Sequence, residues 1–141
     1  MLENVNQKLV DIVEEARNIT VLEFDVVEGV RNKATQEVMF KTGVSGSLVS
    51  PHQFGMAIAT LIYVEGIPQT SSRVYEELAT VMKYAAQNLD AGIFWGGAPH
   101  ISDITKIEVE EMGMLINDYA NKYGNERPLI INPGYFELVL D

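Results

Sequence analysis

The first 26 residues change from a helical to a strand-like spacing of hydrophobic positions. Apolar residues recur every three or four positions, at Leu2, Val5, Leu9, Ile12 or Val13, and Ala16, which predicts an amphipathic helix. Over residues 22–26, apolar residues alternate with acidic ones, which predicts a strand with one buried and one exposed face. The pattern then predicts a turn over residues 31–36 and a second strand within residues 37–50.

Residues 50–64 combine a helix start with a strand-like composition. Ser50 can cap a helix whose first position is Pro51, and the Gln53 side chain can reach back to the cap. Residues 58–64 are nevertheless rich in β-branched side chains, which favour strands. We therefore expect a helix that turns into a strand, and the choice between helix and strand over residues 56–64 stays open.

The clearest helix covers residues 71–89. Ser71 or Ser72 can cap it, and its apolar residues follow at helical spacing: Val74, Leu78, Val81, Ala85 and Leu89. A turn over residues 90–92 and a short apolar strand over residues 93–95 come next.

The last third of the chain predicts a helix and a hairpin. Residues 107–110 alternate as a strand would, but Leu115, Tyr119 and Tyr123 predict a helix that stops at Gly124. Residues 128–131 and 135–140 flank Pro133-Gly134, which fits the central positions of a type II turn. These elements together predict an α+β protein made of one domain, residues 1–141. Its mostly antiparallel sheet would be covered on one side by three or four helices, and it would end in a C-terminal β-hairpin.

Charge and composition narrow the possible partners. Twenty acidic and ten basic residues give a net charge of −10, which disfavours nucleic acid and anionic membranes as partners. The chain has no Cys, which excludes disulfides and thiolate metal sites. The apolar run over residues 56–64 is too short to cross a bilayer, and the N-terminus does not resemble a signal peptide. We therefore expect a soluble cytoplasmic protein, and the sequence indicates no cofactor or metal site.

The segment DAGIFWGGAPHISD, residues 90–103, is the strongest candidate for a site. Trp95, Gly96 and Gly97 could offer a ligand an aromatic face and accessible backbone N–H groups, while His100 and Asp103 could transfer a proton. The alternative is structural: Trp95 belongs to the core, the glycines let the chain turn, and Asp103 caps the next helix. The structural alternative is the simpler account of one loop with mixed chemistry.

Three glutamates, Glu108, Glu110 and Glu111, form the densest acidic cluster. Carboxylates at this spacing can bind Mg²⁺ or Ca²⁺, but exposed glutamates are common on acidic proteins. We expect this cluster to be a solvated face.

These features favour a non-catalytic protein that acts through homo-oligomeric or protein–protein assembly, because no complete catalytic motif occurs and apolar strands suit an interface. The alternative is a small-molecule-binding protein or modest hydrolase with a pocket around Trp95, Gly96, Gly97 and His100. A third hypothesis, an acidic mimic of nucleic acid, suits the charge, but the carboxylates are scattered along the chain.

Overall fold

The computed structural model describes residues 2–29, 55–123 and 131–140. Helices and strands alternate irregularly along these residues, as the α+β prediction requires. In chain order they are α1 (Gln7–Ile19), β1 (Glu23–Glu28), β2 (Ala57–Val64), β3 (Ile67–Pro68), α3 (Ser72–Asn88), β4 (Gly92–Trp95), the 3₁₀ helices η2 (Ile104–Lys106) and η3 (Val109–Met114), α4 (Leu115–Tyr123) and β5 (Tyr135–Val139).

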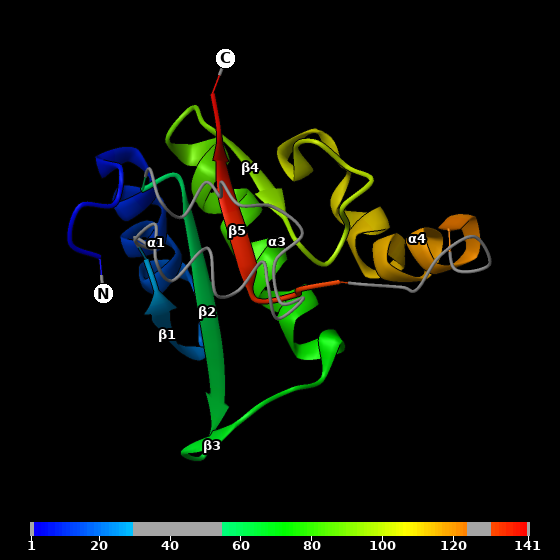
Figure 1. The fold of residues 1–141 in the computed structure, drawn as a ribbon, viewed down its shortest axis with the longest axis horizontal. Coiled ribbons are helices and arrows are strands. Elements are labelled where there is room, and N and C mark those ends of the chain that lie inside the picture. The colour runs from blue at the N-terminus through cyan, green and yellow to red at the C-terminus, as the bar shows by residue number, and fades with distance from the viewer. Residues whose placement is uncertain (1, 30–54, 124–130, 141) are drawn as a thin grey trace, which may run out of the picture.

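The strands form an antiparallel sheet in the order β1–β2–β5–β4, with β3 paired to β2. The C-terminal strand β5 thus lies between β2 and β4. Figure 1 shows α1 and α3 together on one side of this sheet and α4 beyond the β4 side. A tight turn joins β2 to β3, and its residues Glu65 and Gly66 both have positive φ, 51° and 79°. Two consecutive left-handed residues give the twist that two-residue hairpins prefer.

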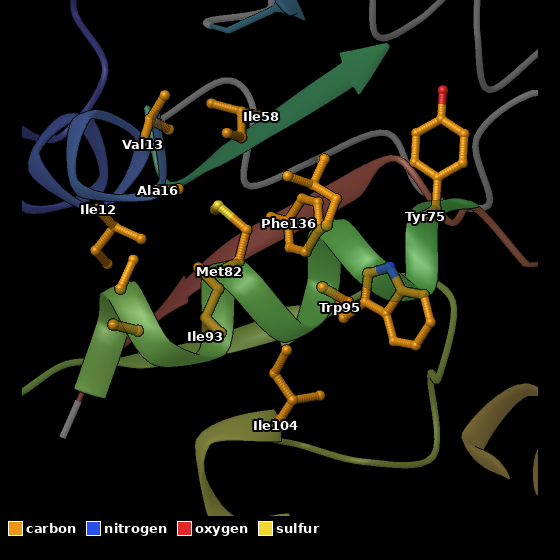
Figure 2. Close-up of a cluster of buried hydrophobic side chains, with 14 of the residues drawn as sticks. Ile12, Val13, Ala16, Ile58, Tyr75, Met82, Ile93, Trp95, Ile104 and Phe136 are labelled. Carbon is orange, nitrogen blue, oxygen red and sulfur yellow. The ribbon is translucent and has the colours of Figure 1, made fainter. Parts of the chain in front are cut away.

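The core lies between the helices and one face of the sheet. Each strand alternates, so every second side chain points into the core: Phe24 and Val26, Ile58 and Ile62, Ile93 and Trp95, Phe136 and Leu138. The helices contribute Leu9, Ile12, Val13 and Ala16 from α1 and Leu78, Ala79, Met82, Ala85 and Ala86 from α3. Figure 2 shows several of these side chains in contact across the two layers. We call the opposite face of the sheet, which points away from α1 and α3, the outer face.

The N-terminal helix starts later than its hydrophobic pattern predicts. α1 begins at Gln7 because Asn6 caps it, its side chain accepting from the Lys8 backbone N–H at 2.9 Å. Leu2 and Val5 precede the helix and still pack against the core. The strand predicted over residues 22–26 is confirmed as β1, with Phe24 and Val26 buried and Glu23 and Asp25 exposed.

Residues 57–64 are a strand, β2, so the β-branched composition decided their structure. The helix start predicted at residues 50–53, the turn at 31–36 and the strand within 37–50 lie outside the described residues. The helix predicted over residues 71–89 is confirmed as α3, with Ser71 at the cap position but without a side-chain capping bond.

The strand considered for residues 107–110 is wrong. The 3₁₀ helix η2, which Asp103 caps, ends just before these residues at Lys106, and the 3₁₀ helix η3 begins within them at Val109. The helix through Leu115 and Tyr119 is confirmed as α4. Glu108, Glu110 and Glu111 are all exposed, as expected of a solvated face.

The C-terminal strand is confirmed as β5, while residues 128–130 of the predicted hairpin lie outside the described chain. A turn forms before β5, closed by the Tyr135 N–H donating to the Asn132 carbonyl at 3.1 Å. It is not type II, because that turn needs a positive φ at its third residue and Gly134 has none. Glycine is needed there for space instead: a Cβ on Gly134 would lie 2.6 Å from the Thr60 carbonyl oxygen.

Candidate functional site

Trp95 is a core residue. Its side chain is fully buried beside Phe136, its partner in the β4–β5 register, and Figure 2 shows it among the side chains next to α3. The indole N–H donates to the Pro133 carbonyl at 2.7 Å, which satisfies the one polar atom of the ring. Trp95 therefore offers no exposed face on which a ligand could stack.

Gly96 and Gly97 let the chain pass through two crowded places. A Cβ on Gly96 would lie 2.3 Å from the Asn132 carbonyl oxygen, and one on Gly97 would lie 2.3 Å from the Trp95 ring. Gly96 also exchanges backbone hydrogen bonds with the turn before β5: its N–H donates to Tyr135 at 2.9 Å, and its carbonyl accepts from Asn132 at 3.0 Å. These geometries match the structural interpretation of the segment.

The turn formed by residues 132–134, which we call the supported turn, is held from two sides. From β4, Trp95 and Gly96 bind it as described above. From β2, the Thr60 backbone N–H and hydroxyl both donate to the Gly134 carbonyl at 2.8 Å. The side chains that follow the turn on β5 are consequently fixed relative to both neighbouring strands.

The first side chain after the supported turn that points to the outer face is Tyr135, and the next is Glu137. Both are half-buried, and the Tyr135 hydroxyl donates to Glu137 Oε2 at 3.1 Å. The Phe94 ring meets the Tyr135 ring edge-on, with centroids 6.1 Å apart. A hydrogen-bonded phenol and carboxylate therefore stand together on the outer face.

His100 lies in an aromatic cluster and not beside Trp95. Its ring stacks on Tyr119 of α4 at 5.4 Å, and Tyr123 lies 6.5 Å away. Nδ1 is buried and finds no hydrogen-bond partner among the described residues. Burial lowers the pKa of His100 below its usual 6.5, with the charge of Lys122 acting in the same direction and that of Asp118 opposing it. The neutral imidazole is the form that this site favours.

Asp103 links β4 to η2. One carboxylate oxygen accepts from the Ile93 N–H at 3.2 Å, the Thr105 N–H at 3.0 Å and the Thr105 hydroxyl at 2.7 Å. Asp103 thus caps η2, as the structural interpretation proposed. It also lines a polar hollow of about 330 Å³ together with Gln87, Asp90 and Lys106.

A larger hollow, about 760 Å³, lies at the other side of the sheet beside β1. Arg17, Asp25 and Val27 are among its lining residues. The Arg17 guanidinium stacks on the Phe24 ring at 4.5 Å and donates to the Phe24 carbonyl at 2.7 Å. Both contacts hold the Arg17 guanidinium within the fold, so Arg17 has a structural role beside this hollow.

Within the described residues, no group of three His, Cys, Asp or Glu side chains could hold a metal ion. The second histidine of the chain, His52, lies outside them. No described helix is both long and apolar enough to cross a membrane.

An α+β sheet with helices on one face and a hydrogen-bonded polar pair on the other is compatible with many activities. The sequence matches the phage L-alanyl-D-glutamate peptidase family over residues 1–117, and the chain belongs to this family.

Among solved structures, the chain resembles the crystal structure of the Serratia marcescens L-Ala D-Glu endopeptidase ChiX, with a TM-score of 0.73. The two sequences are 22% identical, and the alignment covers 98% of this chain and 83% of that one. This likeness establishes a common fold. No curated protein matches the sequence.

The expectation of a non-catalytic protein acting through assembly is wrong, because the family is one of peptidases. The findings indicate a hydrolytic enzyme. Binding of a ligand by Trp95, Gly96, Gly97, His100 and Asp103 stays a prediction. The structure places Trp95 and Gly96 in the support of one turn, Gly97 against the Trp95 ring, and His100 in a separate cluster.

Sequence reasoning did not single out Tyr135 and Glu137. A signal was present, since these residues form the polar side of an alternating strand directly after Pro133-Gly134. The unusual composition around Trp95 pointed to residues that support β5 and not to the polar side chains on its outer face.

Proposed function

We propose that this protein hydrolyses the peptide bond between L-alanine and D-glutamate. The observation that carries the proposal is the family match over residues 1–117, which spans most of the 141 residues. The fold shared with an L-Ala D-Glu endopeptidase supports it. A thiol nucleophile is excluded in this chain, because it contains no Cys.

The test uses a synthetic N-acetylated peptide containing one L-Ala–D-Glu bond. Purified protein should release N-acetyl-L-alanine and a fragment with a new D-Glu amino terminus, both identified by mass spectrometry. The L-Ala–L-Glu isomer is the matched substrate control and should be cleaved far more slowly. Parallel reactions after dialysis against a chelator, and after readdition of divalent metals, test for a metal requirement. Intact L-Ala–D-Glu peptide under all of these conditions would refute the proposal.

Each histidine of the chain should be replaced separately in this assay. His52→Ala and His100→Ala distinguish the two side chains whose ordinary pKa values suit proton transfer near neutral pH. Because the His100 ring stacks on Tyr119 of α4, its replacement removes packing as well as any part in catalysis. The melting temperature of each variant is therefore measured in parallel.

A cytoplasmic location and a homo-oligomeric or protein partner remain proposals. The negative charge and the apolar strands of the sequence support them. Fractionation of the producing cells tests the location, and native mass spectrometry at micromolar concentration tests the self-association.

A further inference from the structure

The outer face around Tyr135 and Glu137 has short side chains on the neighbouring strand β2. In the β2–β5 register, Ala59 is the partner of Tyr135 and Ala57 is the partner of Glu137. Alanine methyl groups end close to the backbone, whereas the phenol and the carboxylate extend further from the sheet. The polar pair therefore stands beside a strand whose side chains at these positions are short.

The pair carries two complementary hydrogen-bonding functions. The Tyr135 hydroxyl is a donor, as its bond to Glu137 Oε2 at 3.1 Å shows, and the Glu137 carboxylate is an acceptor with two oxygens. A peptide backbone offers the matching groups, an acceptor carbonyl and a donor N–H. The chemistry of the pair thus fits a peptide better than a purely anionic or purely cationic ligand.

The supported turn fixes where these groups stand. Tyr135 begins β5 immediately after the turn that Trp95, Gly96 and Thr60 hold by hydrogen bonds. Groups that recognise a substrate need such a rigid position, because small displacements weaken hydrogen bonds to it. Trp95 and Gly96 thus act as the support of Tyr135.

We propose that Tyr135 and Glu137 contact the peptide backbone of the substrate. When the peptide binds, the Tyr135 hydroxyl turns from Glu137 Oε2 and donates its one hydrogen to a backbone carbonyl, and the Glu137 carboxylate accepts from a backbone N–H. Like charge keeps the D-glutamate side chain away from Glu137, so the pair recognises the backbone and not the acidic group. This inference rests on the proposed function, because the substrate class comes from it.

The experiment measures both hydrolysis and binding of the L-Ala–D-Glu peptide. Tyr135→Phe and Glu137→Gln keep the size of each side chain and remove one hydrogen-bonding function. Each should lower kcat/KM about tenfold or more, the effect of losing a hydrogen bond to a substrate group. Because the two side chains act together, the double variant should lose much less than the product of the two single effects.

Tyr63→Phe is the matched control. Tyr63 lies on the outer face of β2, where it pairs with Glu23 and Pro68, and its hydroxyl should be dispensable. Melting temperatures identify any variant that fails through folding. For such a variant, Tyr135→Leu and Glu137→Met, which also lack the hydroxyl and the carboxylate, provide second substitutions at the same positions.

Peptide binding, measured by NMR titration, distinguishes a failure of this inference from a failure of the proposed function. Normal hydrolysis by folded Tyr135→Phe and Glu137→Gln variants would overturn this inference and leave the proposed function intact. Binding without hydrolysis by the wild type, weakened in both variants, would support the inference and refute the proposed function. A wild-type protein that neither binds nor cleaves the peptide would refute both.

Discussion

Gly96→Ala is the sharpest test of the supported turn. The added methyl group would lie 2.3 Å from the Asn132 carbonyl oxygen and 2.9 Å from the Tyr135 Cβ, whereas ordinary contacts begin near 3.4 Å. The obstacle is backbone, so no side chain can rotate away. Either the β4 end or the turn must move by about 1 Å, the difference between these distances.

The expected loss of stability follows from two contributions. Forcing an extra methyl group into a packed site costs about 1 to 3 kcal/mol. The displacement also weakens the two backbone hydrogen bonds between Gly96 and the turn, each worth about 1 kcal/mol net. Restricting the unfolded chain returns up to about 1 kcal/mol. We therefore expect Gly96→Ala to lower the free energy of unfolding by about 2 to 3 kcal/mol.

Urea unfolding followed by Trp95 fluorescence measures this change. A loss of 2 to 3 kcal/mol corresponds to a midpoint about 1 to 2 M lower for a typical dependence on urea. Gly113→Ala is the control, because a Cβ there would meet nothing within 4 Å and alanine favours helical backbone. Its midpoint should stay level or rise slightly. If both variants unfold at the wild-type midpoint, the close approach at Gly96 does not restrain the turn.

Three further predictions concern single side chains. Trp95, the only Trp, should emit at short wavelength and resist iodide quenching, because it is fully buried; a red emission that iodide quenches readily would contradict the packing. Thr60→Val should cost about 1 kcal/mol in urea unfolding, because the hydroxyl bond to Gly134 is lost while the backbone N–H still donates there; an unchanged midpoint would count against that bond. His100, whose pKa burial lowers, should contribute stability that is complete above pH 6.5 and is lost as the pH falls through the folded-state pKa, since the unfolded chain takes up the proton first. Urea unfolding between pH 5 and 8 should therefore show a steeper acid loss for the wild type than for His100→Gln, and parallel curves would exclude this role.

Much of the fold could be predicted from periodicity. α3 and β1 follow their hydrophobic patterns, because a helix or strand with one buried face leaves a regular spacing in the sequence. Boundaries were less predictable, since the start of α1 depends on the Asn6 cap and not on the apolar residues before it. The 3₁₀ helices after Asp103 were missed because an alternating pattern needs a pairing partner to become a strand, and the capped turn provides none.

The candidate site could not be predicted in the same way, because it depends on which strands are neighbours. Tyr135 and Trp95 are distant in sequence, and only the position of β5 between β2 and β4 brings the supported turn against Gly96. A local sequence pattern cannot show that position 96 needs glycine because the Asn132 carbonyl lies where a Cβ would be. The sequence therefore left open both a ligand-binding loop and a structural role for this segment.

The same reasoning explains why the peptidase class was missed. A search for motifs looks for reactive side chains close together in sequence, but a sheet assembles its displayed groups from several strands. In this fold, Tyr135 and Glu137, which we propose contact the peptide, follow the supported turn. Trp95, the most conspicuous residue of the sequence, lies in the core and supports that turn. If that division of roles holds, substitutions around Trp95 should reduce hydrolysis only in proportion to their effect on the turn. Tyr135→Phe and Glu137→Gln should instead reduce hydrolysis by more than the loss of their mutual hydrogen bond lowers stability.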